Sequence, residues 1–206
     1  RIYAALICAM ILLCGSPMTQ AEQVPSFNLP VACTPGVDCW IVNYFDHDPG
    51  PGMLDYTCGR LSYDGHGGTD YALRDRTVMA AGVAVLAVAQ GVVKAVRDGI
   101  PDINMAQTGY ETIEGRECGN GVLLDLGASW ETQYCHLRRE SVAVKPGDSV
   151  AAGQMLGLVG LSGRTEFPHL HFSVRYRGRN LDPFTGRGRA SGCTLGKTPL
   201  WSETAL

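Results

Sequence analysis

The chain has 206 residues, of which 45% are hydrophobic and 18% charged, and its formal net charge is −3. That length suits one domain, and the apolar fraction is large enough for a packed core, so general disorder is excluded. The negative balance gives no support to nucleic-acid binding through a surface that neutralises phosphates. The eight cysteines contain no C-x-x-C pair, which argues against a zinc finger.

The first 21 residues have the three parts of a secretory signal peptide. A single positive charge is followed by a short apolar run, and small residues precede Glu22. The apolar run is shorter than the roughly 20 residues that cross a bilayer, although a retained anchor is the alternative. We therefore expect an exported chain, periplasmic or extracellular, with no membrane attachment after signal cleavage. The acidic balance favours a periplasm of the Gram-negative type.

Removal of residues 1–21 leaves six cysteines, an even number that favours disulfides in an oxidising compartment. Six cysteines allow fifteen pairings, and the sequence does not choose among them. We favour a small loop closed by Cys33–Cys39, a bond across a hairpin between Cys118 and Cys135, and a bond joining the two ends of the domain, Cys58–Cys193.

The remaining chain divides into three parts. Residues 22–57 are predicted to form an irregular N-terminal arm, because proline and glycine interrupt any regular pattern there. Residues 58–190 are rich in short β runs separated by glycine-containing turns and show no convincing helical period. Residues 191–206 form a C-terminal tail. The prediction is a mainly β, antiparallel domain, with strands expected near 83–88, 91–96, 121–126, 130–137, 155–159 and 170–174.

Four of the five histidines lie in patterns that suit a metal site. His66 begins a glycine-rich turn that ends at Asp70, so the imidazole and the carboxylate can converge. His169 and His171 are two residues apart on a predicted strand, so both rings face one side. Two neutral imidazoles and one carboxylate suffice to bind a catalytic Zn²⁺ and leave a position for water. The same ligand types also suit the Fe²⁺ of an oxygenase.

Three segments together resemble the signatures of the lysostaphin/LytM-type zinc metallopeptidases, the peptidoglycan endopeptidase family. They are residues 66–70, Tyr134-Cys135-His136-Leu137 and His169-Leu170-His171-Phe172. The resemblance extends over about residues 58–184. It implies a β-sheet core with the site in a groove, one Zn²⁺ per chain, and hydrolysis of peptide cross-links through a metal-activated water. The implied substrate is the peptide stem of peptidoglycan, and we expect a monomer that binds no nucleic acid.

The resemblance also implies a role for each site residue. His66, Asp70 and His171 would bind zinc. His136 and His169 would be the catalytic pair that moves a proton and donates a hydrogen bond to the oxyanion, and the sequence does not decide which one is the general base. The bond that is cut is equally open.

Three other functions are also compatible with parts of this sequence. A non-catalytic relative that regulates cell-wall amidases would have lost zinc or catalytic residues, whereas all five positions are filled here. An iron oxygenase would leave His136 and His169 without a role, and a wall-binding or metal-sequestering module would show no turnover. Asn43 or His47 of the arm could approach the metal, as inhibitory segments do in some relatives, but a structural arm is favoured.

Arginines crowd the last part of the domain, near Glu166 and Asp182. Attraction to substrate carboxylates is one explanation of this cluster, and a solvated strand face and tail are the explanation that the sequence favours. The arginines are Arg164, Arg175, Arg177, Arg179, Arg187 and Arg189.

Overall fold

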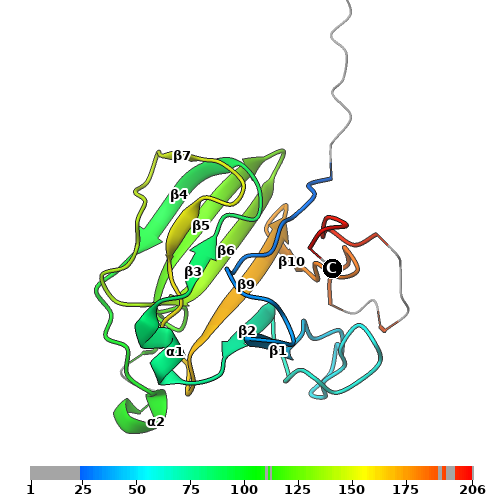
Figure 1. The fold of residues 1–206 in the computed structure, drawn as a ribbon. Coiled ribbons are helices and arrows are strands. Elements are labelled where there is room, and N and C mark those ends of the chain that lie inside the picture. Colours follow the sequence, from blue (N-terminus) through cyan, green and yellow to red (C-terminus); the bar gives the residue numbers. More distant parts are fainter. Residues whose placement is uncertain (1–23, 110, 112, 190–191, 194–197, 206) are drawn as a thin grey trace, which may run out of the picture.

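The computed structural model describes residues 24–109, 111, 113–189, 192–193 and 198–205, and one antiparallel sheet dominates it (Figure 1). Its strand order is β1-β2-β9-β6-β5-β4-β7, with β10 also paired to β9, and β3 and β8 form a second, two-stranded sheet. The mainly β, antiparallel fold predicted from the sequence is confirmed. The strands are β1 (Cys39–Asn43), β2 (Thr69–Leu73), β3 (Ala84–Leu86), β4 (Gly91–Arg97), β5 (Asn120–Gly127), β6 (Trp130–Leu137), β7 (Ser149–Val150), β8 (Met155–Leu158), β9 (His169–Tyr176) and β10 (Arg179–Leu181).

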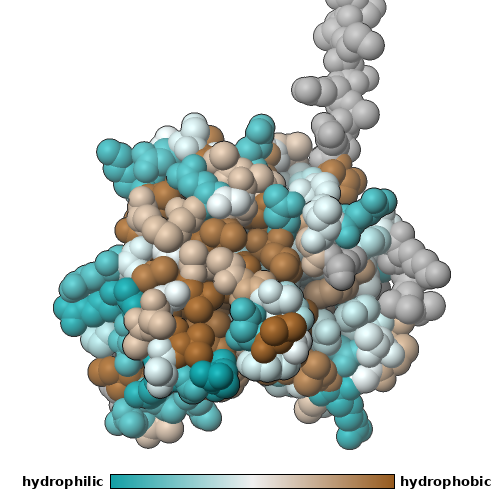
Figure 2. Space-filling model, viewed as in Figure 1, coloured by the Kyte–Doolittle hydropathy of each residue, from teal (hydrophilic) through white to brown (hydrophobic). Residues whose placement is uncertain are grey.

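Strand β9 lies in the interior of the large sheet and separates the core from the site. Leu170, Phe172 and Val174 are fully buried on its core side. Because successive strand side chains alternate between the two faces, His169, His171 and Arg175 lie on the opposite face. Figure 2 shows apolar residues gathered over the middle of the face seen in Figure 1, with hydrophilic residues around its edge.

The hairpin of β5 and β6 follows the turn that the sequence indicates. Ala128 and Ser129 both have positive φ angles, 47° and 65°. A two-residue hairpin turn with positive φ at both central positions matches the right-handed twist of the strands it joins. This hairpin carries His136 near the end of β6 and places it beside β9.

The N-terminal arm is less irregular than predicted. Residues Cys39–Asn43 form β1, which pairs antiparallel with β2 at the edge of the sheet. The β-branched pair Ile41-Val42 suits an extended strand, and that signal is outweighed in the sequence by the prolines and glycines around it. Phe27 is fully buried, with its ring against Phe172 of β9. The arm therefore contributes to both the sheet and the core.

Two short helices were not predicted, α1 (Arg76–Ala81) and α2 (Met105–Thr108). Each is too short to show a helical period in its sequence. The N-terminus of α1 depends on Asp75, whose carboxylate accepts hydrogen bonds from the backbone N–H groups of Thr77 and Val78.

All three favoured disulfides are present: Cys33–Cys39, Cys58–Cys193 and Cys118–Cys135. The second joins residues that are 135 positions apart, and a β-bridge between Phe27 and Trp201 lies on the same side of the molecule. The arm and the C-terminal segment therefore lie together (Figure 1).

The predicted signal peptide lies outside the described residues. Within the part of the chain that the structure describes, no helix combines the length and the hydropathy needed to cross a membrane.

The arm's contribution to the core can be measured with Phe27→Ala. Truncation of a fully buried phenylalanine that contacts Phe172 and Trp201 should lower the free energy of unfolding by about 3–5 kcal/mol. Val37→Ala is the matched control, because Val37 is in the same arm but 71% exposed, and its effect should stay within about 0.5 kcal/mol. Chemical denaturation measures both, and equal effects of the two changes would contradict the packing described here.

Candidate active site

The pairing of β2 with β9 creates the centre of the site. In that register Asp70 lies directly opposite His171, and His66 precedes β2 by a turn. Nδ1 of His171 is 2.8 Å from Oδ1 of Asp70, and Nε2 of His66 is 3.1 Å from that oxygen and 3.1 Å from Nδ1 of His171. The structure thus brings together the three residues that the sequence nominates as metal ligands.

The chemistry of these three atoms fits a cation. Nδ1 of His66 donates its hydrogen to the backbone carbonyl of Tyr44 at 2.7 Å, so neutral His66 turns the lone pair of Nε2 toward the carboxylate of Asp70. Two acceptors in contact need a cation between them. Tetrahedral zinc ligands lie roughly 3.3 Å apart, close to the separations seen here, and two nitrogens with one oxygen form a suitable set for Zn²⁺.

The carboxylate of Asp70 is held at both oxygens. Oδ1 faces the two imidazoles, whereas Oδ2 accepts a hydrogen bond from the side-chain amide of Asn43 at 2.9 Å. Burial alone would raise the pKa of Asp70, but its close contacts with the ring nitrogens of His171 and His66 outweigh burial and hold this pKa well below its ordinary value. The group is therefore an anion at neutral pH, as a metal ligand must be.

His136 reaches the site through an irregularity in β6. The β5–β6 register shifts between Asn120 and Val122, so two residues of β6, Cys135 and His136, face a single residue of β5. His136 has a φ of 63°, and its backbone N–H donates to the carbonyl of Cys118. Its Nδ1 donates to the carbonyl of Ser162 at 2.8 Å, which leaves Nε2 as the acceptor of the neutral ring.

His169 lies beside His136, with 4.6 Å between the ring centroids. Nδ1 of His169 is 3.0 Å from the carbonyl of Phe167 and 3.0 Å from the hydroxyl of Thr165, and its Nε2 is 3.7 Å from Oδ1 of Asp70. Burial lowers the pKa of His169, and it lowers that of His136 well below the ordinary histidine value. Both rings are therefore neutral at pH 7, each with a lone pair on Nε2.

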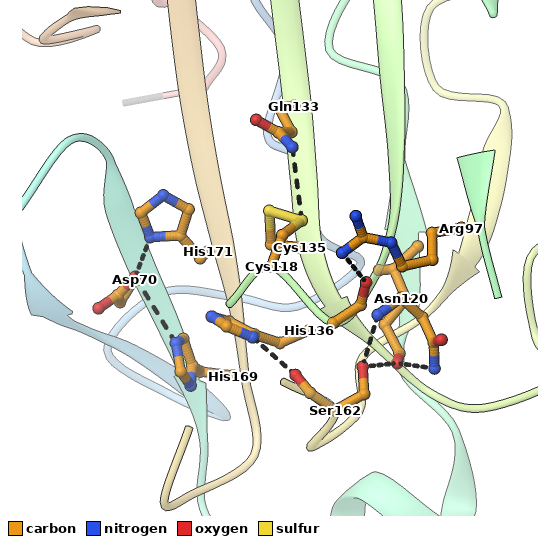
Figure 3. The surroundings of a disulfide bond; sticks show 12 residues. Asp70, Arg97, Cys118, Asn120, Gln133, Cys135, His136, Ser162, His169 and His171 are labelled. Carbon is orange, nitrogen blue, oxygen red and sulfur yellow. Dashed lines mark hydrogen bonds and ion pairs between the residues drawn. A yellow bond between two sulfur atoms is a disulfide. The ribbon is translucent and has the colours of Figure 1, made fainter. Parts of the chain in front are cut away.

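The disulfide between Cys118 and Cys135 borders this pair of histidines (Figure 3). Cys135 precedes His136 and is the register partner of His171, while the carbonyl of Cys118 accepts the N–H of His136. Gly119 packs so closely on Ser162 that a Cβ there would come within 2.3 Å of the Ser162 carbonyl oxygen. The disulfide thus links the segment of Cys118, whose carbonyl accepts the N–H of His136, to strand β6, which carries His136.

Of the two arm residues considered earlier, one reaches the site and the other does not. Asn43 contacts Asp70, whereas His47 is buried elsewhere, with Nε2 at 2.8 Å from a carboxylate oxygen of Asp182. Sequence reasoning missed the supporting groups, the carbonyls of Tyr44 and Ser162 and the hydroxyl of Thr165. Backbone carbonyls leave no signal in a sequence, because every residue has one.

Sequence reasoning also missed Tyr63. Its ring lies 4.4 Å from that of His66, and 48% of the residue is exposed. Burial of part of the side chain, together with the negative charge of Asp70, raises the pKa of Tyr63 to about 12. The hydroxyl beside His66 therefore remains protonated at neutral pH.

The hydrogen bond from Asn43 predicts a measurable effect on metal affinity. Asn43→Ala removes the donor that fixes Oδ2 of Asp70 and should weaken zinc binding by about 10–100-fold, with the fold retained. Val42→Ala is the control for general damage to the strand and should leave affinity unchanged. Competition with a chromophoric chelator measures both, and an unchanged affinity in Asn43→Ala would show that the amide has no influence on the ligand.

Comparison with known proteins relates this geometry to a family. Residues 64–183 match the model of peptidase family M23. Over 64 residues the chain is 41% identical to peptidoglycan DD-endopeptidase ShyA of Vibrio cholerae, a match that covers 31% of this chain and 14% of that protein. Over 95 residues it is 34% identical to the DD-carboxypeptidase/endopeptidase Mpg of Neisseria gonorrhoeae, covering 45% of this chain and 21% of that protein.

The fold has a counterpart among solved structures. A zinc-containing peptidase from Vibrio cholerae superposes with a TM-score of 0.51 at 28% identity, covering 76% of this chain and 39% of that one. The chain therefore matches only a minor part of the length of each relative named here. The family match covers more than half of the chain and includes the metal-site residues His66, Asp70 and His171 and the pair His136 and His169, so the chain belongs to peptidase family M23.

Proposed function

We propose that this chain is an exported zinc metalloendopeptidase that hydrolyses peptide cross-links of bacterial peptidoglycan. The observation that carries the proposal is the convergence of His66, Asp70 and His171 beside two neutral histidines that play no part in that cluster. The names of the relatives, a DD-endopeptidase and a DD-carboxypeptidase/endopeptidase, support the choice of substrate.

In this proposal His66, Asp70 and His171 hold one zinc ion per chain. When bound, the ion supplies a Lewis acid that polarises the substrate carbonyl and lowers the pKa of water to about 7. The hydrogen bonds from His66 to the carbonyl of Tyr44 and from Asn43 to Asp70 orient the ligands. The donor set is complete without either of the remaining histidines.

His136 and His169 then carry the proton chemistry. Each ring is fixed by a hydrogen bond from Nδ1 to a backbone carbonyl, so Nε2 is the atom that accepts a proton and, once protonated, donates one. One ring would act as general base toward water while the other stabilises negative charge on the substrate oxygen. The surroundings of His136 and His169 do not show which ring is the general base, so we propose that the two histidines together carry both roles.

The alternatives explain fewer of these features. An iron oxygenase would use the same three ligands but would give no role to two buried, oriented histidines. A regulator of amidases needs neither a complete ligand set nor the pair, yet every one of the five side chains is in place. The three disulfides support export to an oxidising compartment. We propose that residues 58–190 form the peptidase domain.

Single substitutions separate metal binding from turnover. His169→Ala should retain one zinc per chain and lose about 10²–10⁴-fold in muropeptide release from purified peptidoglycan, because it removes a proton-transfer group only. His66→Ala should lose both zinc and turnover, and a chelator should abolish wild-type activity. Zinc content is measured alongside release. If both variants still cleave, or the zinc-loaded wild type does not, the proposed function is wrong.

The Cys118–Cys135 disulfide should matter for turnover and not for zinc. Cys118→Ser with Cys135→Ser frees the segment whose carbonyl holds the N–H of His136, so kcat should fall by about tenfold, the cost of roughly 1.4 kcal/mol in positioning. Hydrogen exchange at the His136 amide should rise.

The paired control is Cys33→Ser with Cys39→Ser, which removes a disulfide from the arm. It should leave both kcat and exchange at His136 unchanged. If the two double variants lose turnover equally, the Cys118–Cys135 bond serves general stability and has no special relation to His136.

A further inference from the structure

Arg175 lies on the same strand and the same face as His171. The two residues are four positions apart on β9, and the three residues that alternate with them, Leu170, Phe172 and Val174, are fully buried on the core side. At about 3.3 Å per residue, their Cα atoms are about 13 Å apart along the strand. A peptide that crosses this face from the metal site can therefore reach Arg175 after three or four residues.

The guanidinium of Arg175 is held in place by neutral groups. Nε donates to the side-chain amide oxygen of Asn180 on β10 at 3.2 Å, and Nη2 donates to that of Gln133 on β6. Glu131, the register partner of Arg175, forms an ion pair with Lys94 instead. Among the described residues Arg175 has no carboxylate within ion-pair distance. The guanidinium group is therefore oriented by hydrogen bonds, and no carboxylate neutralises its positive charge.

Asn180 also connects Arg175 to a pocket of about 860 Å³ beside the metal site. Its lining residues include His66 and Gly67, which precede β2, and Arg179 and Asn180 of β10. Gly67 is needed for this approach, because a Cβ there would come within 2.5 Å of Nδ2 of Asn180. The pocket thus extends from a metal ligand to the neighbourhood of the oriented guanidinium.

The charge of this pocket is positive. Its lining includes Arg179, Arg187 and Arg189 and, among the described residues, no carboxylate. Arg189 is compensated, since Nη2 lies 3.1 Å from Asp46 and 2.7 Å from Asp64. Arg179 is exposed and forms no ion pair within the described part of the chain. An anionic group would therefore be attracted to this side of the site.

We propose that Arg175 forms a subsite that binds a carboxylate of the peptide substrate. The inference rests on the proposed peptidase function. Two of the five guanidinium N–H groups of Arg175 are used by Gln133 and Asn180, so three remain to bind the carboxylate. The subsite lies about 13 Å from His171 and selects substrates that carry an acidic group at that distance from the bond to be cut.

The test combines two peptides with two variants. The peptides are a cross-linked dimer from peptidoglycan and the same dimer with its carboxylates converted to amides. The zinc-loaded wild type should have a KM about 10–100-fold lower for the carboxylate form, the usual worth of hydrogen bonds to a charged group. Arg175→Gln should reduce this preference to about twofold or less, with zinc content and the kcat for the amidated peptide unchanged.

Arg177→Gln is the matched control. It removes the same charge two residues away, where the guanidinium lies over the ring of Tyr176 at 5.0 Å. This variant should keep the wild-type preference for the carboxylate form. Equal KM values of the two peptides with the wild type, or a preference that survives Arg175→Gln, would overturn the subsite and leave the peptidase function intact.

A binding measurement tests whether the carboxylate subsite exists, even if neither peptide is cleaved. Calorimetric titration of zinc-loaded His169→Ala with each dimer should show tighter binding of the carboxylate form, and adding Arg175→Gln should remove that difference. If the wild type cleaves neither dimer but this difference is found, the proposed function fails and the subsite stands. If no difference is found, the subsite is wrong. Arg175→Lys, which keeps the charge without the fork, replaces the glutamine variant should that one not fold, and it should show a weaker preference.

Discussion

The register between β2 and β9 is the constraint on which the site depends. It places Asp70 opposite His171 and so brings two of the proposed metal ligands, more than 100 residues apart in sequence, to within hydrogen-bond distance. A shift of β9 by one residue would turn His171 toward the core and Leu170 toward solvent, and the buried side chains of β9 forbid it. The hydrophobic core therefore fixes the geometry of the polar site on the other face of the sheet.

Around that centre, supporting groups come from segments remote in sequence. The arm contributes Asn43 to Asp70 and the carbonyl of Tyr44 to His66, and the loop before β9 contributes the carbonyl of Ser162 to His136. The two nitrogens of the His66 ring and of the His136 ring are thereby assigned, one to a carbonyl and one to the site. Strand β1 of the arm therefore pairs with β2 and also fixes one oxygen of Asp70 through Asn43.

The sequence predicted that His66, Asp70 and His171 lie together because the spacing of these side chains carries that information. The H-x-x-x-D spacing and the H-x-H alternation place functional groups on one side of a turn or strand, and the three disulfides followed from an even count and plausible loops. It could not predict strand β1 amid prolines, nor helix α1, which is shorter than two turns. The hydrogen bonds that fix Arg175 could not be predicted either, because the two amide side chains that accept them belong to other strands and meet Arg175 only through the sheet register.

We propose that the five residues divide into two imidazole ligands with one carboxylate and a separate pair of histidines. X-ray absorption of the wild type loaded with one equivalent of zinc can test this division. A first shell of nitrogen and oxygen at about 2.0–2.1 Å, containing two imidazoles and no sulfur, is expected. Three or four imidazoles in that shell, or sulfur at about 2.3 Å, would contradict it.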